Sequence, residues 1–224
     1  MGILLKKGDK GAEVVILQKA LTRVGLPVYH DGLFGPITEE AVMAYQRKMG
    51  LKVDGIVGAA TWAALIPFTI TKSKRNIKEI IVHCSDTPEG RHHTVADIRT
   101  WHKAKGWNDI GYHYVVYIDG SIHNGRSVDI GGAHCSGHNS NSIGVCYVGG
   151  CEGEVKNGKI VPKTDANGYH LVKDTRTWEQ KESLKYLLKE LKKLYPNAKI
   201  YGHHDFDKGK ACPSFDAKAE YKNI

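Results

Sequence analysis

The sequence predicts two domains of different class: a small bundle of three helices, followed by an α/β or α+β domain whose mixed central sheet is flanked by helices. Two observations lead to this prediction. Residues 31–38 (DGLFGPIT) recur as residues 54–61 (DGIVGAAT), within a segment whose apolar residues have helical spacing. From residue 77 onward, short β-branched runs alternate with helical patterns, as expected for one sheet covered by helices. We therefore place the domains at residues 1–66 and 77–224.

The first domain is predicted from its repeat. In each copy the Asp-Gly pair makes a tight turn, and a second glycine precedes the start of a helix. Pro36 suits the first position of such a helix. Between the turns, apolar residues fall on helical stripes, namely Val14, Leu17, Leu21 and Val24, then Ala41, Val42 and Tyr45. This half of the sequence shows no obvious nucleophile, base or metal cluster, so we interpret it as a binding module.

The second domain follows a predicted linker at residues 67–76 (PFTITKSKRN), which has no clear hydrophobic period. The Asp-Gly pair at 119–120 suits the turn of a β-hairpin, and the helix predicted near the C-terminus has leucines on one side. In chain order we predict a strand at 78–82, a helix at 94–105, a hairpin at 114–123, a strand at 142–148, a helix at 177–195 and a strand at 199–201.

Composition limits the class of partner. The chain has 224 residues, of which 41% are hydrophobic and 25% charged, as in folded proteins. A formal net charge of +8 favours anionic partners, although a solvated basic surface explains it equally well. No run of Lys or Arg exceeds two residues and no basic stretch interleaves aromatic residues, so we expect no nucleic-acid binding. We also expect no membrane insertion, because no apolar stretch approaches the ~20 residues that span a bilayer.

Cysteine use and the N-terminus suggest where the protein is made. Five cysteines are an odd number, and a chain of this size needs no disulfide framework. We expect ordinary buried thiols apart from one metal ligand, and synthesis in a reducing compartment. The apolar run at residues 3–5 is far too short for a signal-peptide core, so we expect synthesis in the cytoplasm. We expect a monomer.

Three residues at or after predicted strand ends are candidates for a catalytic zinc site. His83 ends one apolar strand, His203 leaves another, and Cys212 follows nine positions later, before a proline. Two imidazoles and a thiolate are good ligands for Zn²⁺ and leave its fourth position open. Tyr112 and Lys210 would add a hydroxyl and a cation beside it. Taken singly, each candidate is weak: a lone histidine is usually structural, Lys210 could be a solvated loop lysine, and Tyr112 a strand aromatic.

Together these residues lie in motifs that resemble one enzyme family. The motifs are VHCS at 82–85, IRTWHKAKGWNDIGYHY at 98–114, HNSNSIGVCYVGG at 138–150, GHHD at 202–205 and KACPSFD at 210–216. They resemble the zinc-dependent N-acetylmuramoyl-L-alanine amidases of the amidase-2 type, which include phage lysozyme-like amidases and, more distantly, animal peptidoglycan recognition proteins. The resemblance implies that His83, His203 and Cys212 bind Zn²⁺, and that Tyr112 and Lys210 form the catalytic pair.

The same resemblance suggests further roles. It implies that His134 contacts substrate, while His204 and Asp205 are candidates to support the ligands, since ligating imidazoles need hydrogen-bond partners. One departure is the spacing from His203 to Cys212, which is one residue longer than in the phage pattern. That leaves Lys208 as an alternative to Lys210, although the adjacency of Lys210 to the ACP sequence favours Lys210.

The first domain resembles the three-helix peptidoglycan-binding domain attached to many cell-wall hydrolases. The match runs through the GxxG pair at 8–11, the LQxxL sequence at 17–21, both Asp-Gly turns, YQ at 45–46 and TW at 61–62. The two resemblances imply a peptidoglycan hydrolase that cleaves the amide between N-acetylmuramic acid and L-alanine, in a phage or prophage endolysin. The alternatives are a non-catalytic peptidoglycan recognition protein, a regulatory protein that uses an amidase fold, and a bacterial autolysin or recycling amidase.

Overall fold

The chain divides into two compact units, Met1–Thr69 (the N-terminal unit) and Ile70–Ile224 (the C-terminal unit). The computed structural model describes residues 4–65 and 69–224. The predicted linker at 67–76 begins with two residues that lie outside the described ranges. The domain limits 1–66 and 77–224 therefore stay a prediction.

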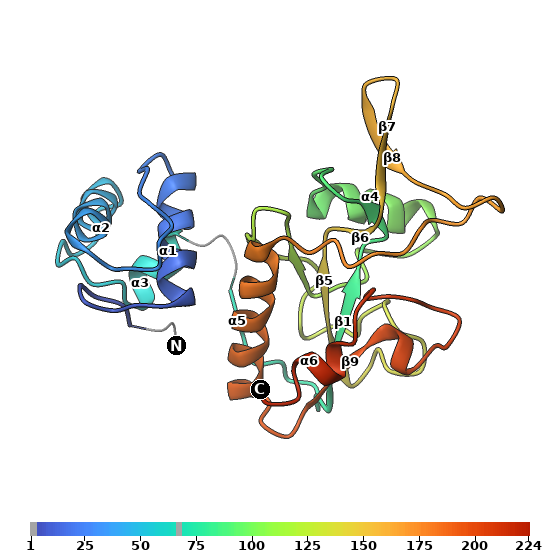
Figure 1. Cartoon of the computed structure of the whole chain (residues 1–224). Coiled ribbons are helices and arrows are strands. Elements are labelled where there is room, and N and C mark those ends of the chain that lie inside the picture. Colours follow the sequence, from blue (N-terminus) through green and yellow to red (C-terminus); the bar gives the residue numbers. More distant parts are fainter. Residues whose placement is uncertain (1–3, 66–68) are drawn as a thin grey trace. The chain divides into compact units, whose positions relative to one another are not determined.

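The described part of the N-terminal unit forms α1 (Ala12–Arg23), α2 (Pro36–Lys48) and α3 (Ala59–Leu65) (Figure 1). Pro36 lies in the first turn of α2, where its missing N–H has no helical acceptor to lose. The helices bury the apolar stripes found in the sequence: Leu17 and Leu21 of α1 and Val42 of α2 are fully buried. The helical bundle predicted for this region is confirmed.

The sequence repeat is explained by two equivalent hydrogen-bond networks. In the first copy, the Gln18 side-chain amide donates to Asp31 Oδ1 at 2.7 Å and to Thr38 Oγ1 at 3.2 Å. Its oxygen accepts from the N–H of Gly32 at 2.9 Å, and Gly32 has φ +72°, which favours glycine. The second copy repeats these bonds around Gln46, with partners Asp54, Gly55 and Thr61. The repeated aspartate, glycine and threonine thus hold each turn against its helix.

A mixed five-stranded sheet in the order β4-β3-β5-β1-β9 forms the centre of the C-terminal unit. Its strands are β1 (Glu79–Cys84), β3 (Tyr114–Val116), β4 (Ile122–Asn124), β5 (Ser142–Tyr147) and β9 (Lys199–Gly202). β1 pairs in parallel with both β5 and β9, and only β3 with β4 is antiparallel. The predicted mixed sheet is confirmed. Because parallel strands end at the same edge, residues that follow β1 and β9 are brought together there.

Two long helices flank the sheet (Figure 1). α4 (Val95–Ala104) packs through Val95 and Ile98 against Val115 of β3. α5 (Trp178–Leu194) buries Leu184, Leu187, Leu188 and Leu191, the leucine face seen in the sequence. Both helices start with capping boxes, at Thr94 and Thr177. Within residues 4–65 and 69–224, no helix combines the length and apolar character required to cross a membrane.

The stretch between β5 and α5, for which the sequence suggested no element, contains short strands. β6 (Gly150–Cys151) pairs with β2 (Thr87–Pro88), and β7 (Gly153–Lys156) forms a hairpin with β8 (Lys159–Pro162) that projects from the unit in Figure 1. Asn157 and Gly158 at its tip have φ +51° and +72°. An Asn-Gly pair is the strongest short hairpin signal, so the sequence contained the information needed to predict this element. The C-terminal end adds a 3₁₀ turn, His203–Asp205, and α6 (Ala217–Glu220).

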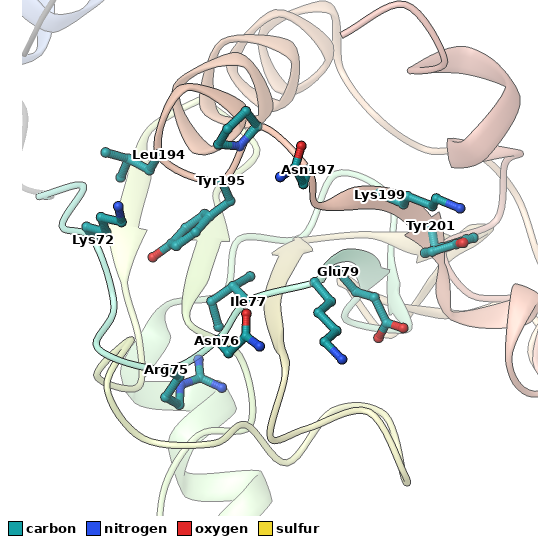
Figure 2. Close-up of a pocket in the computed structure, with 12 residues that line it drawn as sticks. Lys72, Arg75, Asn76, Ile77, Glu79, Leu194, Tyr195, Asn197, Lys199 and Tyr201 are labelled. Atoms are coloured by element: carbon teal, nitrogen blue, oxygen red, sulfur yellow. The ribbon is translucent and has the colours of Figure 1, made fainter.

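The residues that precede β1 are bound to the C-terminal unit. The Ser73 N–H donates to the Tyr195 hydroxyl at 2.6 Å, and the Arg75 Nε–H donates to the carbonyl of Val128 at 2.7 Å. Figure 2 shows Tyr195, at the end of α5, facing this segment across a pocket of about 550 Å³. The pocket lies at the start of β1, beside Glu79, whereas His83 lies at the other end of the strand.

Candidate metal centre

The structure brings His83, His203 and Cys212 together at one edge of the sheet. Their ligand atoms all lie within 4.8 Å of one another, and His83 Nδ1 is 3.6 Å from Cys212 Sγ. A tetrahedral ion bonded to nitrogen at ~2.1 Å and to sulfur at ~2.3 Å would separate these two atoms by about 3.6 Å. The donor set and its spacing therefore fit zinc. His83 is aimed rigidly, because the preceding residues of β1, Ile80, Ile81 and Val82, are fully buried.

The loop at 202–212 is closed by backbone hydrogen bonds that place the other two ligands. His203 begins the 3₁₀ turn directly after β9, and Asp205 Oδ2 accepts from the N–H of Gly202 at 2.8 Å. The N–H of His204 donates to the carbonyl of Cys212 at 2.8 Å. The His204 and Asp205 side chains are 4.0 Å apart, so in the structure the two residues hold the loop through the His204 N–H and the Asp205 carboxylate.

A chain of hydrogen bonds sets the proton positions on His83. It ends at the carbonyl of His138, which can only accept, so the Ser142 hydroxyl donates to it at 2.7 Å. Ser142 Oγ then accepts from His134 Nε2 at 3.4 Å, which leaves His134 Nδ1 to accept from His83 Nε2 at 3.0 Å. With its proton on Nε2, His83 presents an Nδ1 lone pair toward Cys212. This is the tautomer a metal ligand requires.

His134, which we expected to contact substrate, lies directly beside His83, with its Nδ1 3.0 Å from His83 Nε2. Its side chain is buried, and its ring fills space left by two glycines. A Cβ atom on Gly132 or Gly144 would lie 2.3 or 2.5 Å from His134 Cδ2. The N–H of His134 also donates to Asn139 Oδ1 at 2.8 Å. The sequence could not distinguish a residue in the cleft from one directly behind a ligand, because both positions suit a buried polar side chain.

The surroundings of the site favour neutral forms of His83, His203 and Cys212, so that Cys212 ionises only when a cation is near. Burial, reinforced by the nearby His134 and His203, holds the pKa of His83 well below its usual value. Burial also lowers the pKa of His203. The hydrogen bond with the Cys84 side chain, together with burial, raises the pKa of the Cys212 thiol well above its usual value. Ionisation of this thiol at neutral pH therefore requires a positive charge beside it.

A pocket of about 600 Å³ opens beside the three ligands and is lined by Tyr112 and Lys210 as well as His203 and Cys212. The ring of Tyr112 is 5.2 Å from that of His83, and burial raises the tyrosine pKa well above its usual value. Its hydroxyl therefore stays protonated and can donate a hydrogen bond. Lys210 contributes to the pocket wall and Lys208 does not.

Sequence reasoning missed other residues of this pocket. His102, on α4, lies beside Tyr112 with ring centres 5.3 Å apart, and its Nδ1 accepts from the N–H of Gly111 at 2.9 Å. Burial lowers the pKa of His102 to about 4, so it is neutral at pH 7. Trp101 and Tyr169 line the same pocket. His102 and Trp101 lie within the motif at 98–114, but nothing in their spacing singled them out, and Tyr169 lies outside the motifs.

Comparison with known proteins decides the family. Residues 73–215 match the family described as N-acetylmuramoyl-L-alanine amidase. The chain belongs to this family. Residues 10–65 match a second family, described as putative peptidoglycan binding domain. Both identifications made from the sequence are confirmed.

Phage endolysins are among the relatives of this amidase. The endolysin of Escherichia phage T7 is 40% identical over 147 residues, which are 66% of this chain and 87% of the relative. The endolysin of Klebsiella phage KP32 is 40% identical over 155 residues, 69% of this chain and 90% of the relative. The phage relatives match only about two thirds of the amidase.

Solved structures show the same fold. The endolysin amidase LysCS from Clostridium intestinale aligns with a TM-score of 0.51 and 23% identity, covering 70% of this chain and 94% of that one. The Drosophila recognition protein PGRP-LB aligns with a TM-score of 0.50 and 24% identity, covering 73% and 90%. At these identities the likeness extends to the fold alone.

Proposed function

We propose that the amidase holds Zn²⁺ through His83, His203 and Cys212 and hydrolyses the bond between the N-acetylmuramic acid lactyl group and L-alanine. The observation that carries the proposal is the orientation of His83, whose Nδ1 lone pair is directed toward Cys212 by the hydrogen bonds through His134 and Ser142. The ligands border a pocket large enough for part of a glycopeptide.

An amide reacts very slowly with water at neutral pH, so its hydrolysis needs a strong catalyst. Bound Zn²⁺ supplies a Lewis acid that polarises the carbonyl and makes water a stronger nucleophile at neutral pH. The Lys210 ammonium stabilises the negative charge that develops on the carbonyl oxygen. The protonated Tyr112 hydroxyl donates a hydrogen bond within the same pocket, where it orients the reacting groups. His134 acts as a positioning residue for His83, through the 3.0 Å hydrogen bond between the two imidazoles.

The biological setting is a phage or prophage endolysin made in the host cytoplasm and acting on the cell wall. Relatives of similar sequence are phage endolysins, and the N-terminal unit belongs to a peptidoglycan-binding family. We assign wall attachment to residues 1–66 and hydrolysis to residues 77–224. A net charge of +8 helps to retain the enzyme on an anionic wall.

The test is release of new amino termini from purified peptidoglycan by the full chain. Zinc-loaded enzyme should release L-alanine N-termini and leave glycan strands intact, whereas chelated enzyme and Cys212→Ser should not. New reducing sugar ends would indicate a glycosidase. Wall binding without cleavage by the zinc-loaded protein would indicate a recognition protein and overturn the proposal.

A further inference from the structure

A second group of side chains that could bind a metal ion lies apart from His83, His203 and Cys212. Asp86, Cys151 and His170 place a carboxylate oxygen, a thiol sulfur and an imidazole nitrogen within 4.8 Å of one another. None of the three belongs to the His83 cluster. They come from separate parts of the C-terminal unit: the turn after β1, strand β6, and the segment that follows β8.

The backbone holds each of these side chains in place. Cys151 is fully buried, pairs with Pro88 of β2 and forms a bridge with Val172. His170 forms an antiparallel bridge with Thr164. Asp86 has φ +55°, in the left-handed region that aspartate adopts more readily than most residues with a Cβ atom.

The spacing and chemistry suit a transition metal. His170 Nδ1 and Asp86 Oδ1 are 3.1 Å apart, close to the ~3.3 Å expected for nitrogen and oxygen on one tetrahedral ion. An ion pair between Asp86 and His170 would account for two members of the group, but not for a thiol beside a carboxylate.

We propose that Asp86, Cys151 and His170 form a second zinc-type site, with three protein ligands and a fourth position open to solvent. A thiolate, an imidazole and a carboxylate together favour Zn²⁺ over Mg²⁺ or Ca²⁺, which prefer oxygen ligands alone. Asp86 is exposed and His170 partly exposed, so an ion reaches the site without opening the core.

The site has a consequence for the catalytic pocket. Tyr169, His170 and Val172 line that pocket together with Tyr112 and Lys210. An ion at the second site would tie this wall to the sheet through Cys151 and to the end of β1 through Asp86. The second ion would thus stabilise a wall of the catalytic pocket.

The experiment counts bound zinc in the full chain after equilibration with Zn²⁺ and removal of loosely bound metal. We expect about two equivalents in the wild type and about one in Asp86→Asn, whose amide keeps a hydrogen-bonding group beside His170 but is a poor ligand. Cys212→Ser should also hold about one, and the double variant none. His92→Ala, which removes an exposed histidine from the following loop, is the matched control and should keep both.

A spectroscopic arm identifies the ligand. In Cys212→Ser loaded with Co²⁺, the near-ultraviolet absorption of a thiolate–cobalt bond should remain, and it should vanish when Cys151→Ser is added. One equivalent in the wild type that is lost in Cys212→Ser would overturn the second site and leave the proposed function standing. One equivalent lost only in Asp86→Asn would overturn the His83 site instead. Two equivalents retained by Asp86→Asn, with no cobalt signal dependent on Cys151, would show that the second ion binds elsewhere.

Discussion

Replacing His134 tests whether the hydrogen bond behind His83 prepares the metal site. In His134→Leu the Nε2–H of His83 loses its acceptor, 3.0 Å away, while His83 remains almost completely buried. An unsatisfied buried donor costs about 1–3 kcal/mol. Part of that cost is avoided if His83 changes tautomer, but then Nδ1 carries the proton and cannot bind metal. We therefore expect zinc affinity to fall about 10- to 100-fold, the usual effect of removing a ligand's hydrogen-bond partner.

The assay is competition for zinc against a chromophoric chelator, with amidase activity measured in parallel at saturating zinc. His134→Asn is the matched control, because its Oδ1 can accept near the position of the lost Nδ1, and it should recover part of the affinity. Circular dichroism and the urea midpoint establish that both variants are folded. A folded His134→Leu protein that binds zinc within twofold of the wild type would refute the reasoning.

Three further predictions concern catalysis, stability and pH. Lys210→Met should lower kcat about 100- to 1000-fold with zinc content unchanged, since it removes the ammonium that stabilises the oxyanion. Arg176→Met should lower the free energy of unfolding by about 3 kcal/mol, measured by urea denaturation, because the buried guanidinium pairs with Asp174 at 2.8 Å and stacks on Phe215. Burial lowers the pKa of His113 to about 4, whereas the unfolded value is about 6.5, so at pH 7 the residue is mostly neutral both folded and unfolded. As the pH falls toward 4, only the unfolded chain gains this proton. Between pH 7 and pH 5.5 the free energy of unfolding should therefore fall by about 1 kcal/mol more in the wild type than in His113→Gln.

Each of these has an internal comparison. Lys208→Met, on the same loop but outside the pocket, should leave kcat within twofold; equal losses in both lysine variants would contradict the role given to Lys210. Lys181→Met removes an exposed partner 3.9 Å from Asp174 and should change stability by under about 1 kcal/mol. An Arg176→Met effect no larger than that would show the buried ion network to be unimportant. Identical pH dependence in His113→Gln and wild type would mean that His113 does not resist protonation.

Much of the candidate site could be foreseen because it depends on strand ends. In the parallel pair of β1 and β9, Val82 is opposite Gly202, and a histidine follows each of them. Two apolar strands that each lead into a histidine therefore predict neighbouring imidazoles before any loop is known. The helices could be predicted equally well from the sequence, since their apolar faces and threonine caps are local patterns.

The parts that sequence reasoning missed depend on contacts between distant loops. The place of His134 behind His83 is decided by space left at Gly132 and Gly144, which no periodicity records. The grouping of Asp86 with His170 depends on the path of the chain from β6 to α5. The hairpin of β7 and β8 is a different case, because its Asn157-Gly158 turn was a readable local signal.

The candidate ligand His83 lies far in the sequence from His203 and Cys212, so the three come together only when the C-terminal unit is folded. His83 and Cys212 are separated by 129 positions, so an ion held by both closes most of the C-terminal unit into a loop. A cross-link over a loop of this size restricts the unfolded chain by roughly 4–5 kcal/mol in the chain-entropy description. No partial chain that ends before residue 212 contains the full ligand set. Under the proposed function, a chain that ends before residue 212 is therefore expected to lack hydrolytic activity.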